Sequence, residues 1–194
     1  ILYTPGMLRD KRISVAQHII CWAEEKPHER WEAKSYSMIK VYNTITKKTH
    51  TIHPKTRYFA PAISPDGTTI AAVEVTWEQK YNLVFMNTEG NILRKINLID
   101  NPFIITPRWD NNNTGVVCVL LYPLGKTLAY ISKETDKTNL LLPLSYTEIS
   151  HPVMYNNKVF YTAAYNGLSG IWEYDLTTNE KKQVVLTRFG ADHP

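Results

Sequence analysis

A proline recurs along this chain of 194 residues at nearly constant intervals, each time within a similar short stretch. The four prolines lie 46, 45 and 42 residues apart: Pro61, Pro107, Pro152 and Pro194. A period of about 20 to 50 residues is typical of repeat architectures, in which each repeat is one supersecondary unit that packs against its neighbours. The spacing therefore predicts a chain of similar units.

Turn-forming residues follow the prolines at a fixed distance. Five residues after each of the first three prolines stands an acidic or amide residue: Asp66, Asn112 and Asn157. Asp, Asn and the neighbouring Gly67 tolerate positive φ, so each position predicts a tight turn between two strands. Residues that favour strands follow each turn, at 70–75, 116–121 and 159–163.

A second marker has almost the same period. A short polar residue ends a later strand of each unit, at intervals of 44, 45 and 43 residues: Asn43, Asn87, Ser132 and Asp175. Each unit therefore contains four short strands, which in the second unit are expected at 58–64, 70–75, 82–87 and 92–97. No long stretch combines a helical apolar stripe with helix caps, so the sequence predicts an all-β fold.

Four strands in a repeat of this length is the spacing of a β-propeller blade. We expect one propeller segment over residues 1–194, a partial propeller of about four four-stranded blades at 12–57, 58–101, 102–147 and 148–194. In the first blade Arg12 replaces the opening proline, and the first turn is expected at 16–18. The alternative is a β-sandwich with evenly spaced strands, but a sandwich requires no repeated turn chemistry at fixed offsets.

Composition excludes several classes of protein. The hydrophobic content of 43% is ordinary for a globular chain, and no apolar run approaches the roughly 20 residues of a membrane-spanning helix. The net charge of +4 is spread along the chain, so no nucleic-acid partner is expected. Cys21 and Cys118 lie in apolar runs two repeats apart, so we expect two buried thiols and no disulfide.

Residues 59–71 resemble the repeat of TolB-type propellers, a WD40-like repeat also called PD40, in which Ser-Pro-Asp-Gly joins two apolar strands. Here the motif reads Ser64-Pro65-Asp66-Gly67, while the third unit keeps Pro107-Arg108-Trp109-Asp110 and the fourth keeps only its proline and an Asn-Asn turn. Similar repeats occur in tricorn-like propellers and in those of prolyl oligopeptidases. The resemblance implies a fragment of a larger periplasmic, cell-surface or secreted protein, and no catalytic residue carries over because the motif is structural.

Catalytic and cofactor motifs are lacking. The sequence contains no nucleophile elbow, zinc-binding His-Glu-x-x-His, phosphate-binding glycine loop or Cys-x-x-Cys, so we expect neither an enzyme nor a cofactor or metal. His50 and His53 fall in an expected fourth strand, where an offset of three points them to opposite faces. Glu24 and Glu74 are carboxylates without an evident partner in the sequence.

His151 and His193 each precede a repeat proline in adjacent units, so they should lie near one another around a central channel. Either they are polar residues that cap loops, or they belong to a small-molecule or metal site. The longer loops, which should emerge on one face, are rich in aromatic residues that favour binding. Together these predict a partner-binding face: Trp31, Tyr36, Trp77, Tyr122, Tyr165, His151, His193, Arg57 and Arg188. The alternative is that the aromatic residues cover the edges of their own blades.

Two functions are compatible with these features. The first is a non-catalytic binding or scaffold propeller that acts outside the cytoplasm on a protein, peptide or glycan partner. The second is an accessory propeller of a multidomain hydrolase or peptidase whose catalytic domain lies outside this sequence. We also expect a truncated propeller whose open blade faces close on themselves or self-associate, because uncovered blades expose apolar surface.

Overall fold

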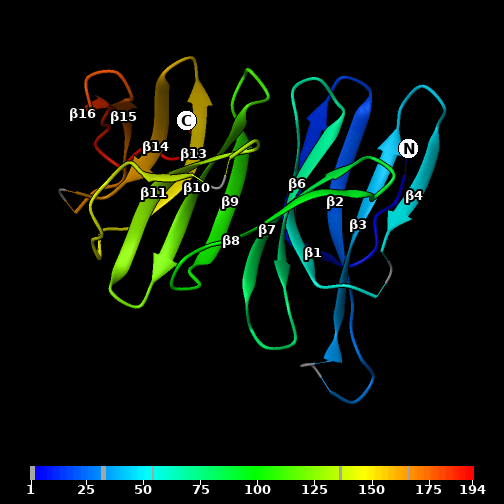
Figure 1. Ribbon diagram of the computed structural model, residues 1–194. Coiled ribbons are helices and arrows are strands. Elements are labelled where there is room, and N and C mark those ends of the chain that lie inside the picture. The colour runs from blue at the N-terminus through cyan, green and yellow to red at the C-terminus, as the bar shows by residue number, and fades with distance from the viewer. Residues whose placement is uncertain (1–2, 32–33, 54, 136, 166) are drawn as a thin grey trace. The chain divides into compact units, whose positions relative to one another are not determined.

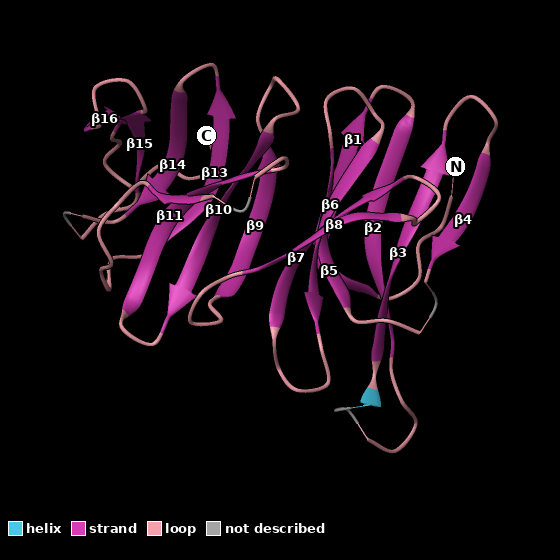
Figure 2. Cartoon of the chain, in the orientation of Figure 1, coloured by secondary structure: helices cyan, strands magenta, loops and turns pink. Residues whose placement is uncertain are grey.

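The computed structural model describes residues 3–31, 34–53, 55–135, 137–165 and 167–194, and strands dominate it (Figure 2). The chain divides into two compact units, Ile1–Asn97 and Leu98–Pro194. Each unit contains two four-stranded antiparallel sheets, in which neighbouring strands are consecutive in the sequence. Within the described ranges, no helix is long and apolar enough to cross a membrane.

The first unit consists of two sheets (Figure 1). The strands of its first sheet are β1 (Leu8–Ala16), β2 (Ile19–Lys26), β3 (Tyr36–Asn43) and β4 (Lys48–Ile52). Those of its second sheet are β5 (Tyr58–Ile63), β6 (Thr69–Val75), β7 (Tyr81–Asn87) and β8 (Ile92–Asn97). The two sheets share an apolar core that includes Cys21, Ile39 and Val41 from one side and Ile70 and Val84 from the other.

The second unit repeats this arrangement. The strands of its first sheet are β9 (Phe103–Trp109), β10 (Gly115–Tyr122), β11 (Gly125–Ser132) and β12 (Thr138–Leu140). Those of its second sheet are β13 (Ile149–Tyr155), β14 (Lys158–Ala163), β15 (Gly170–Asp175) and β16 (Glu180–Val185). Its core joins Val117, Val119 and Leu128 to Val159 and Tyr161 of the second sheet.

The side chain of Asp66 explains the first repeat marker. Its Oδ1 accepts hydrogen bonds from Ser64 Oγ at 2.5 Å, from the Thr68 backbone N–H at 3.0 Å and from Thr68 Oγ1 at 2.9 Å. In the third repeat the turn is closed from Asp110, two residues before the marker residue Asn112, because Asp110 Oδ1 accepts from the backbone N–H groups of Asn112 and Thr114. These carboxylates close the turns between the first and second strands, as short polar side chains do in Asx-turns.

The second marker is a side-chain cap on the turn between the third and fourth strands. Asn43 Oδ1 accepts from the backbone N–H groups of Ile45 and Thr46 at 2.9 and 3.0 Å. The same position in the other repeats caps its turn in the same way: Asn87, Ser132 and Asp175. The second marker in all four repeats, and Asp66 of the first marker, therefore act through local hydrogen bonds, which leave a local pattern in the sequence.

The residue before each repeat proline has a left-handed backbone. The φ angles are 45°, 52°, 50° and 61° at Ala60, Thr106, His151 and His193. In β5, β9 and β13 the pairing register shifts at this residue and its proline, which is a β-bulge. Proline lacks an N–H for the ladder, and a bulge is where a strand tolerates it. A bulge also redirects the side chain that it contains.

Two pairs of residues differ from expectation: the histidines His50 and His53, and the carboxylates Glu24 and Glu74. His53 lies beyond β4, which ends at Ile52, and both His50 and His53 contact one turn through Thr88 O and Gly90 O, each at 2.7 Å. The prediction of opposite faces was therefore wrong, because the strand ends before His53. Glu24 and Glu74 do have partners: Trp22 Nε1 donates to Glu24 at 2.8 Å, and Lys95 Nζ lies 2.8 Å from Glu74.

The cysteines agree with expectation. Cys21 in β2 and Cys118 in β10 are both buried and both remain thiols. Burial raises the pKa of the Cys118 thiol to about 12. The assignment of residues 1–194 to a single propeller segment stays a prediction, because the two units are compact separately.

Candidate binding site

Three predicted site residues meet in the first unit and form what we call the Trp77 cluster: Tyr36, Arg57 and Trp77. The rings of Tyr36 and Trp77 pack edge to face, with centroids 6.2 Å apart and planes at 87°. The guanidinium carbon of Arg57 lies 5.2 Å from the centroid of the Trp77 ring. Such cation–π contacts and T-shaped aromatic pairs are favourable geometries.

The backbone positions this cluster. Arg57 forms a parallel bridge with Ser37, and its carbonyl accepts from the Val75 N–H at 2.9 Å. Trp77 lies in a tight connection between β6 and β7, where the Thr76 N–H donates to Lys80 O at 2.9 Å. In Figure 1 the β2–β3 and β6–β7 connections point to the same end of the unit, and the β1–β2 and β5–β6 turns point to the other. The cluster therefore joins the start of β3, the link between β4 and β5, and the β6–β7 connection.

Charge near the cluster is mixed. A hydrogen bond with the Thr76 side chain is the largest cause that holds the pKa of the Glu78 carboxyl below its usual range, so Glu78 is anionic at neutral pH. The Arg57 guanidinium brings positive charge to the cluster. Trp77 is 55% exposed. An exposed aromatic face beside a fixed cation suits a partner that carries both apolar and acidic groups.

Trp31 lies in the β2–β3 connection with 57% of its surface exposed. The connection is ordered by His28, whose Nδ1 accepts from the backbone N–H groups of Arg30 and Trp31, both at 3.2 Å. Ser35 Oγ accepts from the His28 N–H at 3.1 Å and ties the two sides of the loop. Trp31 is thus presented to solvent by a loop with internal hydrogen bonds.

In the second unit, Tyr165 covers its own sheet. Its ring packs against Trp172 of β15, with centroids 4.7 Å apart and planes at 78°, and Lys181 Nζ lies 3.9 Å from its centroid. Its hydroxyl lies 3.3 Å from that of Tyr161. Tyr165 therefore packs on the inner strands of its own sheet, and its role in partner binding stays a prediction. Tyr122 is half-buried at the end of β10, where burial raises the pKa of its hydroxyl.

His151 and His193 are brought together, as the repeat predicted. Their rings have centroids 3.7 Å apart and planes at 31°. Asp192 lies between them: Oδ1 is 3.2 Å from His151 Nδ1, and Oδ2 is 3.2 Å from His193 Nδ1. Partial burial acts to raise the pKa of Asp192, but hydrogen bonds from Thr162 and from the His193 N–H outweigh it and keep that pKa below its usual value.

The remaining predicted residue is Arg188, which is exposed and lies with its guanidinium carbon 5.8 Å from the centroid of the Phe189 ring. Among the nine predicted residues, Tyr36 and Arg57 contact Trp77 in the first unit, and His151 contacts His193 in the second. That all nine gather on a single face stays a prediction. Sequence reasoning missed Asp192, although its place directly before His193 and Pro194 was a visible signal.

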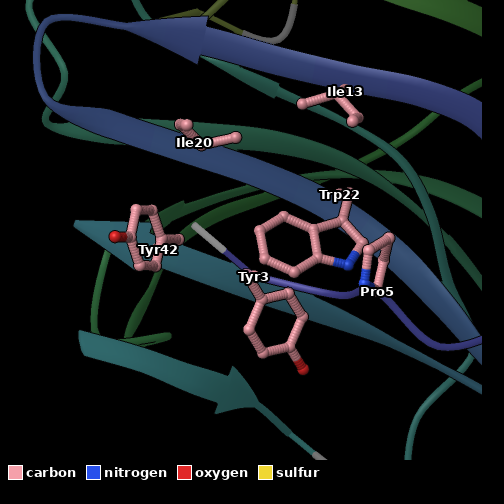
Figure 3. Close-up of a pocket in the computed structure, with 6 residues that line it drawn as sticks. All are labelled: Tyr3, Pro5, Ile13, Ile20, Trp22 and Tyr42. Carbon is pink, nitrogen blue, oxygen red and sulfur yellow. The ribbon is translucent and has the colours of Figure 1, made fainter. Parts of the chain in front are cut away.

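Sequence reasoning also missed an apolar pocket of about 130 Å³ in the first unit. Its lining residues are Tyr3, Pro5, Ile13, Ile20, Trp22 and Tyr42 (Figure 3). Because successive side chains of a strand alternate, Ile20 and Trp22 lie on the face of β2 opposite Cys21 and the core. The Tyr3 ring packs on the Trp22 indole, with centroids 5.2 Å apart.

Sheets of four antiparallel strands in sequential order, with repeated turns and bulges, define a β-propeller. No protein-family model and no curated protein matches the sequence. Solved structures do match. A protein assigned as TolB from Agrobacterium tumefaciens is 9% identical with a TM-score of 0.71, and the match covers 100% of this chain and 67% of that one.

Two peptidase propellers are also similar. The β-propeller domain of the Trilobed protease from Pyrococcus furiosus is 12% identical with a TM-score of 0.66, over 93% of this chain and 57% of that one. The acylaminoacyl peptidase from Pyrococcus horikoshii is 13% identical with a TM-score of 0.68, over 93% of this chain and 32% of that one. The chain therefore has the propeller fold of TolB and of peptidase propeller domains, and it spans only part of these proteins.

Proposed function

We propose that this chain is a non-catalytic binding module that uses the Trp77 cluster to hold a carboxylate-bearing segment of a protein or peptide partner. The observation that carries the proposal is the position of Trp77, which is 55% exposed although Tyr36 and Arg57 both contact it. Contacts on two sides fix the indole before a partner arrives. A fixed side chain loses less conformational freedom on binding than a mobile one.

The chemistry of the cluster defines the partner. Arg57 offers a planar set of N–H donors that matches a carboxylate in two-point geometry, while the indole and phenol rings provide apolar area. Trp, Tyr and Arg are the residue types that contribute most binding energy at interfaces. The partner should therefore present an acidic group next to an apolar or aromatic side chain. Because residues 59–71 resemble the TolB-type repeat, we also propose that the protein acts outside the cytoplasm.

A second candidate is an accessory propeller that positions substrate for a peptidase domain of the same protein. The similarity to propellers from the Trilobed protease and the acylaminoacyl peptidase favours this candidate. The two candidates differ in what lies beside the propeller in the gene. A neighbouring hydrolase domain would support the accessory function, and in that case the Trp77 cluster would contact substrate peptides or the catalytic domain.

The proposal is tested by selecting peptides from a random library on the immobilised chain. We expect enriched peptides to contain Asp or Glu beside an apolar residue, and binding to weaken more than about fivefold in Trp77→Ala and in Arg57→Gln, which corresponds to about 1 kcal/mol. Phe189→Ala is the matched control, because Phe189 is an exposed aromatic residue of the other unit. Peptides that bind all three variants equally would refute the assignment of this site.

A further inference from the structure

Three side chains in the second unit converge without any role in its core: His151 from β13, and Asp192 and His193 from the segment after β16. We propose that these three residues bind a divalent transition-metal ion of the Zn²⁺ class. The site lies in a different unit from the Trp77 cluster, and the proposal does not depend on the function proposed for that cluster.

The distances suit a shared ion. One ligand atom from each residue lies within 4.8 Å of the others, and each imidazole Nδ1 is 3.2 Å from an oxygen of Asp192. Metal bonds of about 2.0–2.2 Å in a tetrahedral site separate neighbouring donor atoms by about 3.3–3.6 Å. Each separation is close to the donor spacing of a tetrahedral site, and the two involve different Asp192 oxygens, Oδ1 with His151 and Oδ2 with His193. The rings are already 3.7 Å apart, and the His193 side chain is 68% exposed, so it has room to rotate and point a ring nitrogen at a shared ion.

The donor set selects the class of ion. Two imidazole nitrogens and one carboxylate oxygen suit Zn²⁺ and its neighbours Cu²⁺, Ni²⁺ and Co²⁺, whereas Ca²⁺ and Mg²⁺ prefer sites built from oxygen alone. The side chains of His151 and Asp192 are 24% and 50% exposed, so water can reach the ion. Three protein ligands leave at least one coordination position for water or for a donor from a partner.

The repeat itself creates the convergence. His151 and His193 occupy the same left-handed position before the repeat proline, with φ of 50° and 61°. Equivalent positions of neighbouring repeats are adjacent, which explains why their rings stack. The backbone N–H of His193 donates to Thr162 Oγ1 at 3.2 Å and holds the second histidine against β14. The backbone thus brings both imidazoles to one place, whether or not an ion is bound.

An ion at this position would join the segment after β16 to β13, the first strand of the same repeat. It would connect β13 to the Asp192–His193 segment, which the described contacts otherwise hold by a few hydrogen bonds. A ligand that binds the folded state and not the unfolded state stabilises it in proportion to the logarithm of its concentration over Kd. Zn²⁺ should therefore raise the melting temperature of the chain.

The experiment is isothermal calorimetry of the whole chain with Zn²⁺, accompanied by thermal melts with and without the ion. We expect one Zn²⁺ per chain, a higher melting temperature, and little response to Ca²⁺ or Mg²⁺. In His151→Gln, Asp192→Asn and His193→Asn, affinity should fall more than about tenfold, since even residues that only support metal ligands cost about 10–100-fold. His18→Gln is the matched control, an exposed histidine in the β1–β2 turn, and should bind as the wild type does.

The variants allow a clear decision even if one of them folds poorly. Asp192 and His193 are largely exposed, so their amide variants should melt like the wild type in the absence of metal. The visible spectrum of bound Co²⁺ provides a second measurement, because the intensity of its bands distinguishes a tetrahedral site from ions coordinated by water. Absence of Zn²⁺ binding, equal binding by His18→Gln and His193→Asn, or tighter binding of Ca²⁺ than of Zn²⁺ would each overturn the proposal.

Discussion

Tyr130 of β11 donates its hydroxyl hydrogen to Asp110 Oδ2 at 2.9 Å. Asp110 also accepts the backbone N–H groups of Asn112 and Thr114, so a single carboxylate joins the turn after β9 to the third strand of the sheet. Burial is the largest cause that raises the pKa of Tyr130 to about 12, and the bond to Asp110 acts in the same direction.

This raised pKa predicts alkaline destabilisation. An unfolded tyrosine ionises near pH 10, so the neutral hydroxyl of Tyr130 stabilises the fold fully below about pH 10 and that contribution is lost as pH rises towards about 12. Tyr130→Phe should be less stable at pH 8 but should lose less stability between pH 8 and 11.5. Urea unfolding across this range measures both, and parallel pH profiles for the two proteins would contradict the assignment.

Asp66 should matter for folding and not for binding. Asp66→Ala removes the acceptor of three hydrogen bonds in the β5–β6 turn and should lower the free energy of unfolding by about 1–2 kcal/mol. Asp66→Asn keeps a carbonyl acceptor and should recover much of the loss. Urea denaturation of both variants tests this, and a wild-type midpoint for Asp66→Ala would exclude a structural role.

Trp31→Ala and Trp77→Ala should each cost less than about 1 kcal/mol of stability, a shift of no more than about 3 °C in melting temperature. Both indoles are more than half exposed, whereas Trp22 is only 4% exposed and its replacement by Ala should cost about 3–5 kcal/mol. Thermal melts of the three variants decide the matter. A large loss in the first two would mean that these aromatic residues support the sheets, as Tyr165 does.

The two thiols should resist modification in the folded protein. Cys21 and Cys118 are fully buried, and only the thiolate reacts, which the pKa of about 12 for Cys118 disfavours further. Ellman's reagent should therefore label neither cysteine before unfolding and two thiols per chain after unfolding without reductant. Finding no reactive thiol in the unfolded sample would show that they pair.

The sequence predicted the repeated turns because their cause is local. Asn43 and Asp66 bind backbone groups within a few residues, so the same chemistry leaves the same mark in each repeat. It did not predict the partner of Glu24, which is Trp22 on the same face of β2, nor the end of β4 before His53. Side-chain rotation and strand ends depend on packing between sheets, and no short pattern records them.

The proximity of His151 and His193 was predictable because equivalent positions of neighbouring repeats lie next to each other in the fold. Asp192 was not recognised, because the corresponding residue of the other repeats is Phe59, Ile105 or Ser150 and none of these is a carboxylate. The Trp77 cluster was foreseen only as residues on a common face. Its geometry depends on the bridge between Arg57 and Ser37, which joins different sheets and has no local signal.

In β5, β9 and β13 the bulge fixes the backbone at the start of the repeat and leaves one side chain free to differ. The residue before the proline of each bulge is Ala60, Thr106 or His151, and His193 before Pro194 has the same left-handed backbone. Alanine, a β-branched residue and an imidazole all occur there, so the same backbone carries very different side chains. Propellers of this kind could acquire new ligand specificity by substitutions at that position alone, and a designer could exchange these residues while leaving every strand unchanged.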